Sequence, residues 1–214
     1  MCIRDRIQTS LLHSNEFSGT IGGTGKLTKN GAGTLTLAGD NSYTGGTVVN
    51  AGVLSVSADK NLGDLSGGVQ LNSGTLRLTG DVTSDRVVAF DAAGGTIDAA
   101  AGTNSTFSGL IDGLGSLTKT GAGTLVLSGS NDYLGGTVVE AGTLSISSND
   151  NLGDAASNLT FNGGTLRVAD SITTDRNVVL NANGGTIETT AGTSTSFTQG
   201  ITGTGKLNKD GAVS

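Results

Sequence analysis

The sequence predicts an all-β protein folded as a parallel β-solenoid with roughly 20–25 residues per turn and open at both ends. Glycine contributes 37 of 214 residues and proline is absent, which disfavours helices and excludes collagen. Short runs alternate apolar and polar residues, as half-buried strands do. The words GAGTLTLAGDNSYTGGTVVNAGVLS at residues 31–55 return as GAGTLVLSGSNDYLGGTVVEAGTLS at 121–145, a shift of 121 − 31 = 90.

This shift divides the chain into units. The first unit covers residues 17–106, the second unit covers 107–196, and a partial third covers 197–214. Residues 1–6 match no repeat, so we expect an unrelated start followed by one continuous solenoid over 7–214. We interpret the chain as a fragment at both ends, because its final residues already depart from the repeated words.

Each unit contains a finer repeat of Gly-Thr-Leu or a close variant, beginning at Gly33, Gly52, Gly74, Gly95 and Gly123. The first three intervals match the coil lengths of a stacked solenoid. The interval from Gly95 to Gly123 is longer and carries the extra segment FSGLIDGLGSLTK. We expect strands whose leucines face inward, for example over residues 34–37.

The short words KNLGD at 60–64 and DNLGD at 150–154 interrupt the strands. We predict a turn, or a single helical turn, that bulges from the solenoid and tucks Leu62 and Leu152 inward. Tyr43 and Tyr133 each precede a Gly-Gly pair. We expect them to pack over this corner with the hydroxyl in water; the alternative is an exposed array on which glycans stack.

The repeated motif supplies the candidate site residues. We predict that its glycines form corners where φ is positive, and that its leucines form the core. These residues are Gly33, Leu35, Tyr43, Gly45, Gly46, Gly52, Gly123, Leu125, Tyr133, Gly135, Gly136 and Gly142.

The phrase LTKxGxGTLxLxGxNxYxGGTxVxxGxLxV, present at 27–56 and 117–146, resembles the autotransporter-associated β-strand repeat, or passenger-associated transport repeat. The resemblance implies a right-handed parallel β-helix that is part of the passenger domain of a Gram-negative autotransporter. It also implies a C-terminal β-barrel translocator as partner, and display at the cell surface, anchored in the outer membrane, or release outside. We expect this segment to lack both the export signal and the barrel.

Composition and charge exclude several classes of function. The formal net charge is −6 and no cluster of Lys and Arg occurs, so no nucleic-acid partner is expected. Cys2 is the only cysteine, so the chain has no internal disulfide. A calcium-binding nonapeptide needs Asp two residues after G-G-x-G, but Leu27 stands there after Gly22-Gly23-Thr24-Gly25-Lys26. We therefore expect no metal and no cofactor.

Catalysis is not predicted. His13 is the only histidine and has no nucleophile motif beside it. A lyase-like β-helix would need one unique charged constellation, whereas the charged candidates recur at equivalent repeat positions, about four turns apart. We predict that they are structural or solvated. They are Arg77, Arg167, Asp85, Asp175, Arg86 and Arg176.

Three hypotheses about function remain. The first is a structural stalk that supports passenger folding and outer-membrane secretion. The second is an adhesin that binds a host surface or glycan through exposed rows of Thr, Asn and Tyr. The third, a polysaccharide lyase, is disfavoured. A plain polar surface without a cleft favours the stalk, a long flat face of Thr or aromatic residues favours the adhesin, and a charged groove favours the enzyme.

Overall fold

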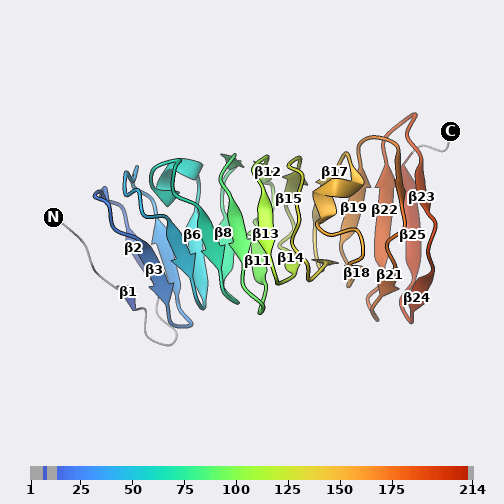
Figure 1. Ribbon diagram of the computed structural model, residues 1–214, viewed down its shortest axis with the longest axis horizontal. Helices are drawn as coiled ribbons and strands as arrows, with labels where there is room; N and C mark the ends of the chain where they lie inside the picture. Colours follow the sequence, from blue (N-terminus) through green and yellow to red (C-terminus); the bar gives the residue numbers. More distant parts are fainter. Residues whose placement is uncertain (1–6, 9–13, 212–214) are drawn as a thin grey trace.

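A computed structural model describes residues 7–8 and 14–211. These residues form an elongated stack of coils that runs from the N-terminal to the C-terminal end of the molecule (Figure 1). Every strand pairing is parallel, and the described helical structure amounts to two short 3₁₀ turns. The predicted all-β parallel solenoid is confirmed. The unrelated start at 1–6 and the divergent end at 212–214 lie outside the described residues, as do Cys2 and His13.

The strands form three long parallel sheets that run along the stack. Sheet 1 contains β1 (Ile7–Gln8), β3 (Leu27–Asn30), β5 (Thr47–Val49), β7 (Val69–Leu71), β10 (Val88–Phe90) and β13 (Ile111–Gly113). Sheet 2 contains β2 (Ser14–Phe17), β4 (Thr34–Leu37), β6 (Val53–Val56), β8 (Thr75–Leu78), β11 (Gly95–Ala99), β14 (Leu117–Thr120), β16 (Thr137–Val139), β18 (Leu159–Phe161), β21 (Val178–Leu180) and β24 (Ile201–Gly203).

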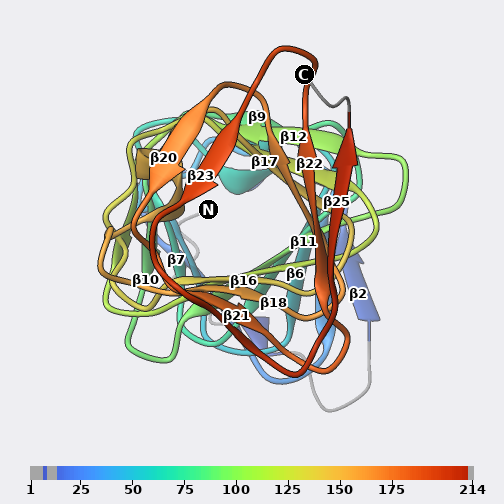
Figure 2. The same cartoon turned by 90° about the vertical axis from the view of Figure 1, so that its right-hand side faces the viewer.

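Sheet 3 contains β9 (Thr83–Ser84), β12 (Asn104–Phe107), β15 (Thr124–Leu127), β17 (Thr143–Ile146), β19 (Thr165–Val168), β22 (Gly185–Thr189) and β25 (Leu207–Gly211). A short fourth sheet pairs β20 (Ile172–Thr174) with β23 (Thr195–Phe197). The 3₁₀ turns are η1 (Asp59–Leu62) and η2 (Asn149–Leu152). Figure 2, along the stack, shows the sheets surrounding a shared interior.

The length of one coil follows from the strand register. Val88 pairs with Val69, 88 − 69 = 19 residues earlier, and with Ile111, 111 − 88 = 23 residues later. The shortest coils are thus slightly shorter than the predicted range. Inside, the expected alternation holds: Leu76 and Leu166 are both fully buried. Each such side chain contributes roughly 1.5–3 kcal/mol relative to exposure.

The 90-residue repeat is not a whole number of coils. Equivalent strands of successive units lie in successive sheets: β3 in sheet 1, β14 in sheet 2 and β25 in sheet 3. The cause is the long interval predicted at Gly95 to Gly123. There the chain passes through β11, β12, β13, β14 and β15, which is one full coil plus one further side. Equivalent residues are therefore displaced both along the stack and around it.

Candidate functional site

The motif glycines fall into two structural groups. Gly46 and Gly52 adopt φ of 79° and 66°, and Gly136 and Gly142 adopt 81° and 61°, the left-handed region that glycine enters without strain. The predicted positive φ holds for the second glycine of each Gly-Gly pair but not for the first, Gly45 and Gly135.

The first glycine of each pair is required for a different reason, the close approach of the neighbouring coil. A Cβ atom on Gly45 would lie 2.6 Å from the carbonyl carbon of Gly25, and one on Gly135 would lie 2.4 Å from that of Gly115. Such contacts cannot form without a backbone shift. Gly123 is equally crowded, against the Ala100 oxygen. The motif therefore specifies how closely the coils stack as well as where the chain turns.

The two motif tyrosines lie inside the solenoid. Tyr43 and Tyr133 are 2% and 0% exposed, so the expectation of a wet hydroxyl is wrong. The Tyr43 hydroxyl forms a 2.7 Å hydrogen bond with Thr47 Oγ1, and the Tyr133 hydroxyl forms a 2.6 Å bond with Thr137 Oγ1. Burial raises the pKa of Tyr43 to about 12 and raises that of Tyr133 further. Neither ring can stack on a glycan.

Beside each tyrosine, buried asparagines join successive coils. In the first unit, Asn41 accepts a 2.8 Å bond from the Ile21 amide and donates a 2.6 Å bond to the Asn61 carbonyl. Asn61 in turn accepts from the amides of Ser57 and Ala58 at the start of η1 and donates to the Gly39 carbonyl. The 3₁₀ turn is thereby held to the coil before it.

The second unit repeats this arrangement with Asn131 and Asn151. The predicted helical turn and the inward positions of Leu62 and Leu152 are confirmed. The asparagines themselves were missed by the sequence analysis. Their position in the repeated words N-x-Y and N-L-G was the available signal, since turns and caps use Asn side chains in this way.

A buried arginine braces each 3₁₀ turn from the following coil. Arg86 is 2% exposed and donates to the carbonyls of Asp59, Gly63, Asp64 and Gly67. Its Nε also lies 2.8 Å from Asp59 Oδ1. Because the guanidinium has five N–H donors in a fixed fork, one side chain satisfies a whole irregular loop.

Arg176 occupies the equivalent place and donates to the carbonyls of Asn149, Gly153 and Asp154. Its Nε bonds the neutral Asn149 Oδ1 at 3.0 Å. Burial lowers the pKa of Arg176, and surrounding carboxylates oppose this shift. Both arginines thus have structural roles.

The other lyase candidates do not converge. Arg77 lies 3.9 Å from Asp98, and Arg167 lies 3.1 Å from Glu188, each pair joining adjacent strands near the surface. Asp85 and Asp175 are exposed. Within the ranges 7–8 and 14–211, no group of three or more His, Cys, Asp or Glu side chains is placed to hold a metal ion.

Two lysines point into the solenoid. Lys29 and Lys119 are fully buried, and each ammonium group donates to three backbone carbonyls. Lys29 Nζ bonds Asn30, Gly31 and Ala51 at 3.2, 2.6 and 3.0 Å. Lys119 Nζ bonds Thr120, Gly121 and Ala141 at 2.6, 2.9 and 3.1 Å. Burial lowers the pKa of both, and that of Lys119 falls to about 8.

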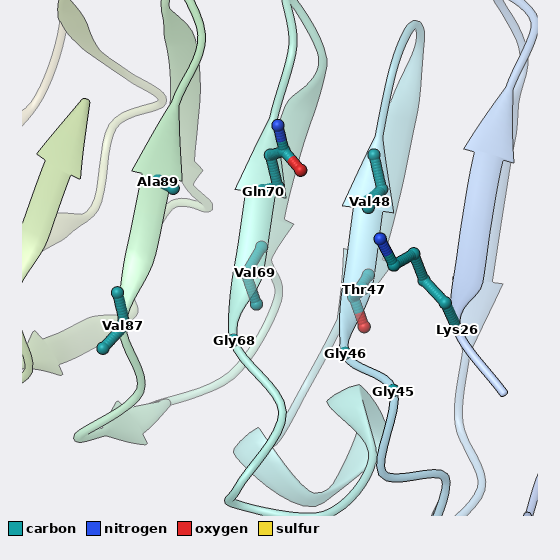
Figure 3. Close-up of a pocket in the computed structure, with 10 residues that line it drawn as sticks. All are labelled: Lys26, Gly45, Gly46, Thr47, Val48, Gly68, Val69, Gln70, Val87 and Ala89. Atoms are coloured by element: carbon teal, nitrogen blue, oxygen red, sulfur yellow. The ribbon is translucent and has the colours of Figure 1, made fainter. Parts of the chain in front are cut away.

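A shallow groove of about 190 Å³ crosses the outside of sheet 1 in the first unit. Figure 3 shows Lys26 extending over β5 at one end, and at the other Ala89 on β10 and Val87 just before that strand. The full lining is Lys26, Gly45, Gly46, Thr47, Val48, Gly68, Val69, Gln70, Val87 and Ala89.

The fold and its buried polar contacts place this protein in the class of parallel β-solenoids built from long repeats. The chain carries two copies of the Passenger-associated-transport-repeat, whose family profile matches residues 27–56 and 117–146. The predicted resemblance is confirmed at the same residues.

Two curated relatives extend this finding. An "Adhesin BmaC autotransporter" of Brucella suis biovar 1 (strain 1330) is 45% identical over 127 residues, which are 59% of this chain and 4% of that protein. An "Extracellular serine protease" of Serratia marcescens is 40% identical over 85 residues, 39% of this chain and 8% of that protein. The chain thus spans a small fraction of either relative. No solved structure matches it. In the described ranges, no helix is long and apolar enough to cross a membrane.

Proposed function

We propose that this chain is a structural stalk segment of a secreted or surface-displayed autotransporter passenger, and that it supports passenger folding and outer-membrane secretion. Its partners are its own neighbouring coils and, in the parent protein, a C-terminal β-barrel translocator. Its place is outside a Gram-negative cell, at the surface or released. The segment itself performs no catalysis.

The observation that carries this proposal is the buried polar network joining consecutive coils. Asn41 links the coil before it to η1, and Arg86 links η1 to the coil after it. The same links recur in the second unit through Asn131 and Arg176. Stability in such a stack is nearly a sum of neighbouring-coil terms. A coil that forms outside the membrane therefore provides the surface on which the next coil folds, and burial opposes backward movement.

A display experiment tests the stalk. The full 214-residue chain is placed between an epitope tag and a β-barrel translocator in a Gram-negative host. We expect protease-resistant surface display of the tag, and its loss when Asn61 and Asn151 are both changed to Ala. Lys60→Ala, on the exposed surface, is the matched control. Equal display by the double variant and the parent would contradict the proposed role of coil stacking.

An adhesin function is the second candidate, because one face carries a long regular row. The row runs along sheet 2 with one outward residue on each successive strand, all partly or fully exposed. Its members, in register, are Thr34, Val53, Thr75, Thr96, Thr118, Val138, Thr160, Val179 and Thr202. We call this the Thr/Val row. Parallel strands space such residues about 4.8 Å apart, so the row presents a flat, repeating surface.

Adhesion is tested on the same displayed chain. Thr96→Lys and Thr118→Lys put bulky charges in the middle of the Thr/Val row without touching the core. We expect adherence of displaying cells to host-cell or glycan surfaces to fall, with display unchanged. Adherence equal to that of the parent would remove the Thr/Val row from consideration and leave the stalk proposal intact.

A further inference from the structure

The groove of the first unit has the chemistry of a small binding site, and this inference rests on the adhesin candidate above. We propose that it binds a carboxylate-bearing saccharide, with the sugar carboxylate on Lys26 and the ring over the apolar floor. The groove volume of about 190 Å³ lies below the range of about 300–1,000 Å³ typical of sites for drug-sized ligands. It suits a single sugar ring.

Charge defines the ligand. The Lys26 side chain is exposed, and over residues 7–8 and 14–211 it forms no ion pair. Among the residues that the structure describes, it is the only charged side chain that lines the groove. The formal net charge of the chain is −6, so an anionic ligand gains no attraction from the overall field. Binding of an anion at this position therefore depends on the local ammonium group.

The rest of the lining favours a sugar ring. Val48, Val87 and Ala89 offer apolar contacts, and Val87 is 46% exposed. Gln70 adds one amide that can donate to and accept from hydroxyl groups. Figure 3 shows Gln70 rising from β7 between the ends marked by Lys26 and Val87. A sugar ring has C–H bonds on one face and hydroxyl groups at its edge, so it can make both the apolar contacts and the hydrogen bonds.

An acidic peptide fits less well. Peptides commonly bind to sheets by adding a strand to an unpaired edge. Each floor strand is already paired on both sides: β5 with β3 and β7, β7 with β5 and β10, and β10 with β7 and β13. The groove also crosses these strands instead of running along one. A peptide laid there would find no free backbone ladder.

The second unit lacks this chemistry. At the equivalent positions, Ser116 replaces Lys26, Asn158 replaces Gly68, and Asn177 replaces Val87. The backbone is preserved, since Thr47 and Thr137 donate alike to the carbonyls of residues 68 and 158. The groove is therefore a local departure from the repeat, as expected of a unique site and not of a stacking element.

The test titrates galacturonic acid into the full chain and follows binding by calorimetry or by chemical-shift changes, with galactose as the matched ligand without the carboxylate. We expect weak saturable binding of galacturonate and at least about tenfold weaker binding of galactose, because a charge-assisted hydrogen bond is lost. Lys26→Ser and Gly68→Asn, each copied from the second unit, should weaken galacturonate binding by a similar factor. Circular dichroism verifies that both variants remain folded.

The reverse exchange sharpens the experiment. Ser116→Lys, Asn158→Gly and Asn177→Val together should create a second groove and raise the binding stoichiometry from one to two. Unchanged galacturonate affinity in both Lys26→Ser and Gly68→Asn would overturn the proposal. So would binding of an acidic peptide in preference to galacturonate. Failure here with adherence retained through the Thr/Val row would refute the groove alone, whereas loss of adherence in row variants with galacturonate binding intact would refute only the row.

Discussion

The two repeat units keep their buried polar contacts and change their surface. Tyr, Asn and Arg occupy the same buried positions in both, with nearly the same partners. The outward positions differ: Gly68 becomes Asn158, and Lys60, paired with Asp40, becomes Asp150. The repeat therefore specifies the contacts between coils, whereas the residues on its outer surface can differ from one unit to the next.

The contact between each arginine and its 3₁₀ turn also differs, at a partly buried position. Arg86 faces the carboxylate of Asp59, whose side chain is 13% exposed, whereas Arg176 faces the neutral amide of Asn149. The two units thus form the same brace with and without an ion pair. Both arginines donate hydrogen bonds to backbone carbonyls. The Asp59 carboxylate therefore adds to an arrangement that also forms without it.

The largest effect is expected from removing these arginines. Arg86→Ala leaves a nearly buried carboxylate and several carbonyls without a donor, so it should cost about 3–5 kcal/mol, typical of breaking a buried pair from one side. Arg176→Ala leaves only neutral groups and should cost about 2–3 kcal/mol. Equilibrium urea unfolding of the full chain measures both.

Asp59→Asn is the matched control, because it gives the first unit the second unit's residue. It should cost less than about 1 kcal/mol and bring the effect of Arg86→Ala close to that of Arg176→Ala. Equal losses in the two single arginine variants would show that the Asp59 carboxylate contributes nothing to the difference.

The next effect concerns the asparagines that hold the 3₁₀ turns. Asn61→Ala and Asn151→Ala each leave two backbone amides and one carbonyl without partners. Each should cost about 2–3 kcal/mol, and the two losses should agree because the contacts agree. Amide hydrogen exchange should show faster exchange in the coil of the mutated turn. A loss of stability in one of these variants but not in the other would contradict the equivalence of the buried contacts in the two units.

The sequence predicts the coils of the solenoid but not the polar contacts inside them. Alternating Leu and the Gly-Thr-Leu spacing are local patterns, and they predicted the strands and the stack. A structural or solvated role was predicted for Arg86, but its burial was not, and Arg is almost never buried unpaired. The carbonyls that satisfy it lie about one coil earlier in the chain, and no local pattern indicates such a contact.

Lys29 carried a usable signal. It stands two residues after the buried Leu27 in the same strand, so the period of two places it inward despite its charge. The shift of each unit by one sheet was not predictable in the same way. It depends on how many sides of the coil the FSGLIDGLGSLTK segment covers, which strand periodicity does not determine.

At alkaline pH, the two buried lysines, Lys29 and Lys119, should differ in how they affect the stability of the chain. The folded pKa of Lys119 is about 8, below its ordinary value of 10.5, so the unfolded chain binds the proton more tightly. Stability from this group therefore rises with pH between about 8 and 10.5. Lys29 shifts in the same direction.

Urea unfolding at stepped pH, comparing the parent with Lys119→Met and Lys29→Met, measures this effect. The rise should become smaller in Lys119→Met, where only the Lys29 contribution remains, and should persist in Lys29→Met. Above pH 10 the trend reverses, because the raised pKa of Tyr43, about 12, keeps its proton on the folded chain while the unfolded chain loses it. A parent whose stability only falls from pH 8 upward would contradict the assignment to Lys119.

The smallest effect is expected on the surface, where the units are most different. Lys60 Nζ lies 2.9 Å from Asp40, with both side chains more than 60% exposed, and the second unit has Asp150 at the position of Lys60. Lys60→Ala should change stability by less than about 1 kcal/mol, and less at high salt, because exposed ion pairs are screened. Unfolding at low and high ionic strength measures it. A larger, salt-independent loss would mean that this pair braces η1 as Arg86 does, and that the division between fixed interior and free surface is drawn in the wrong place.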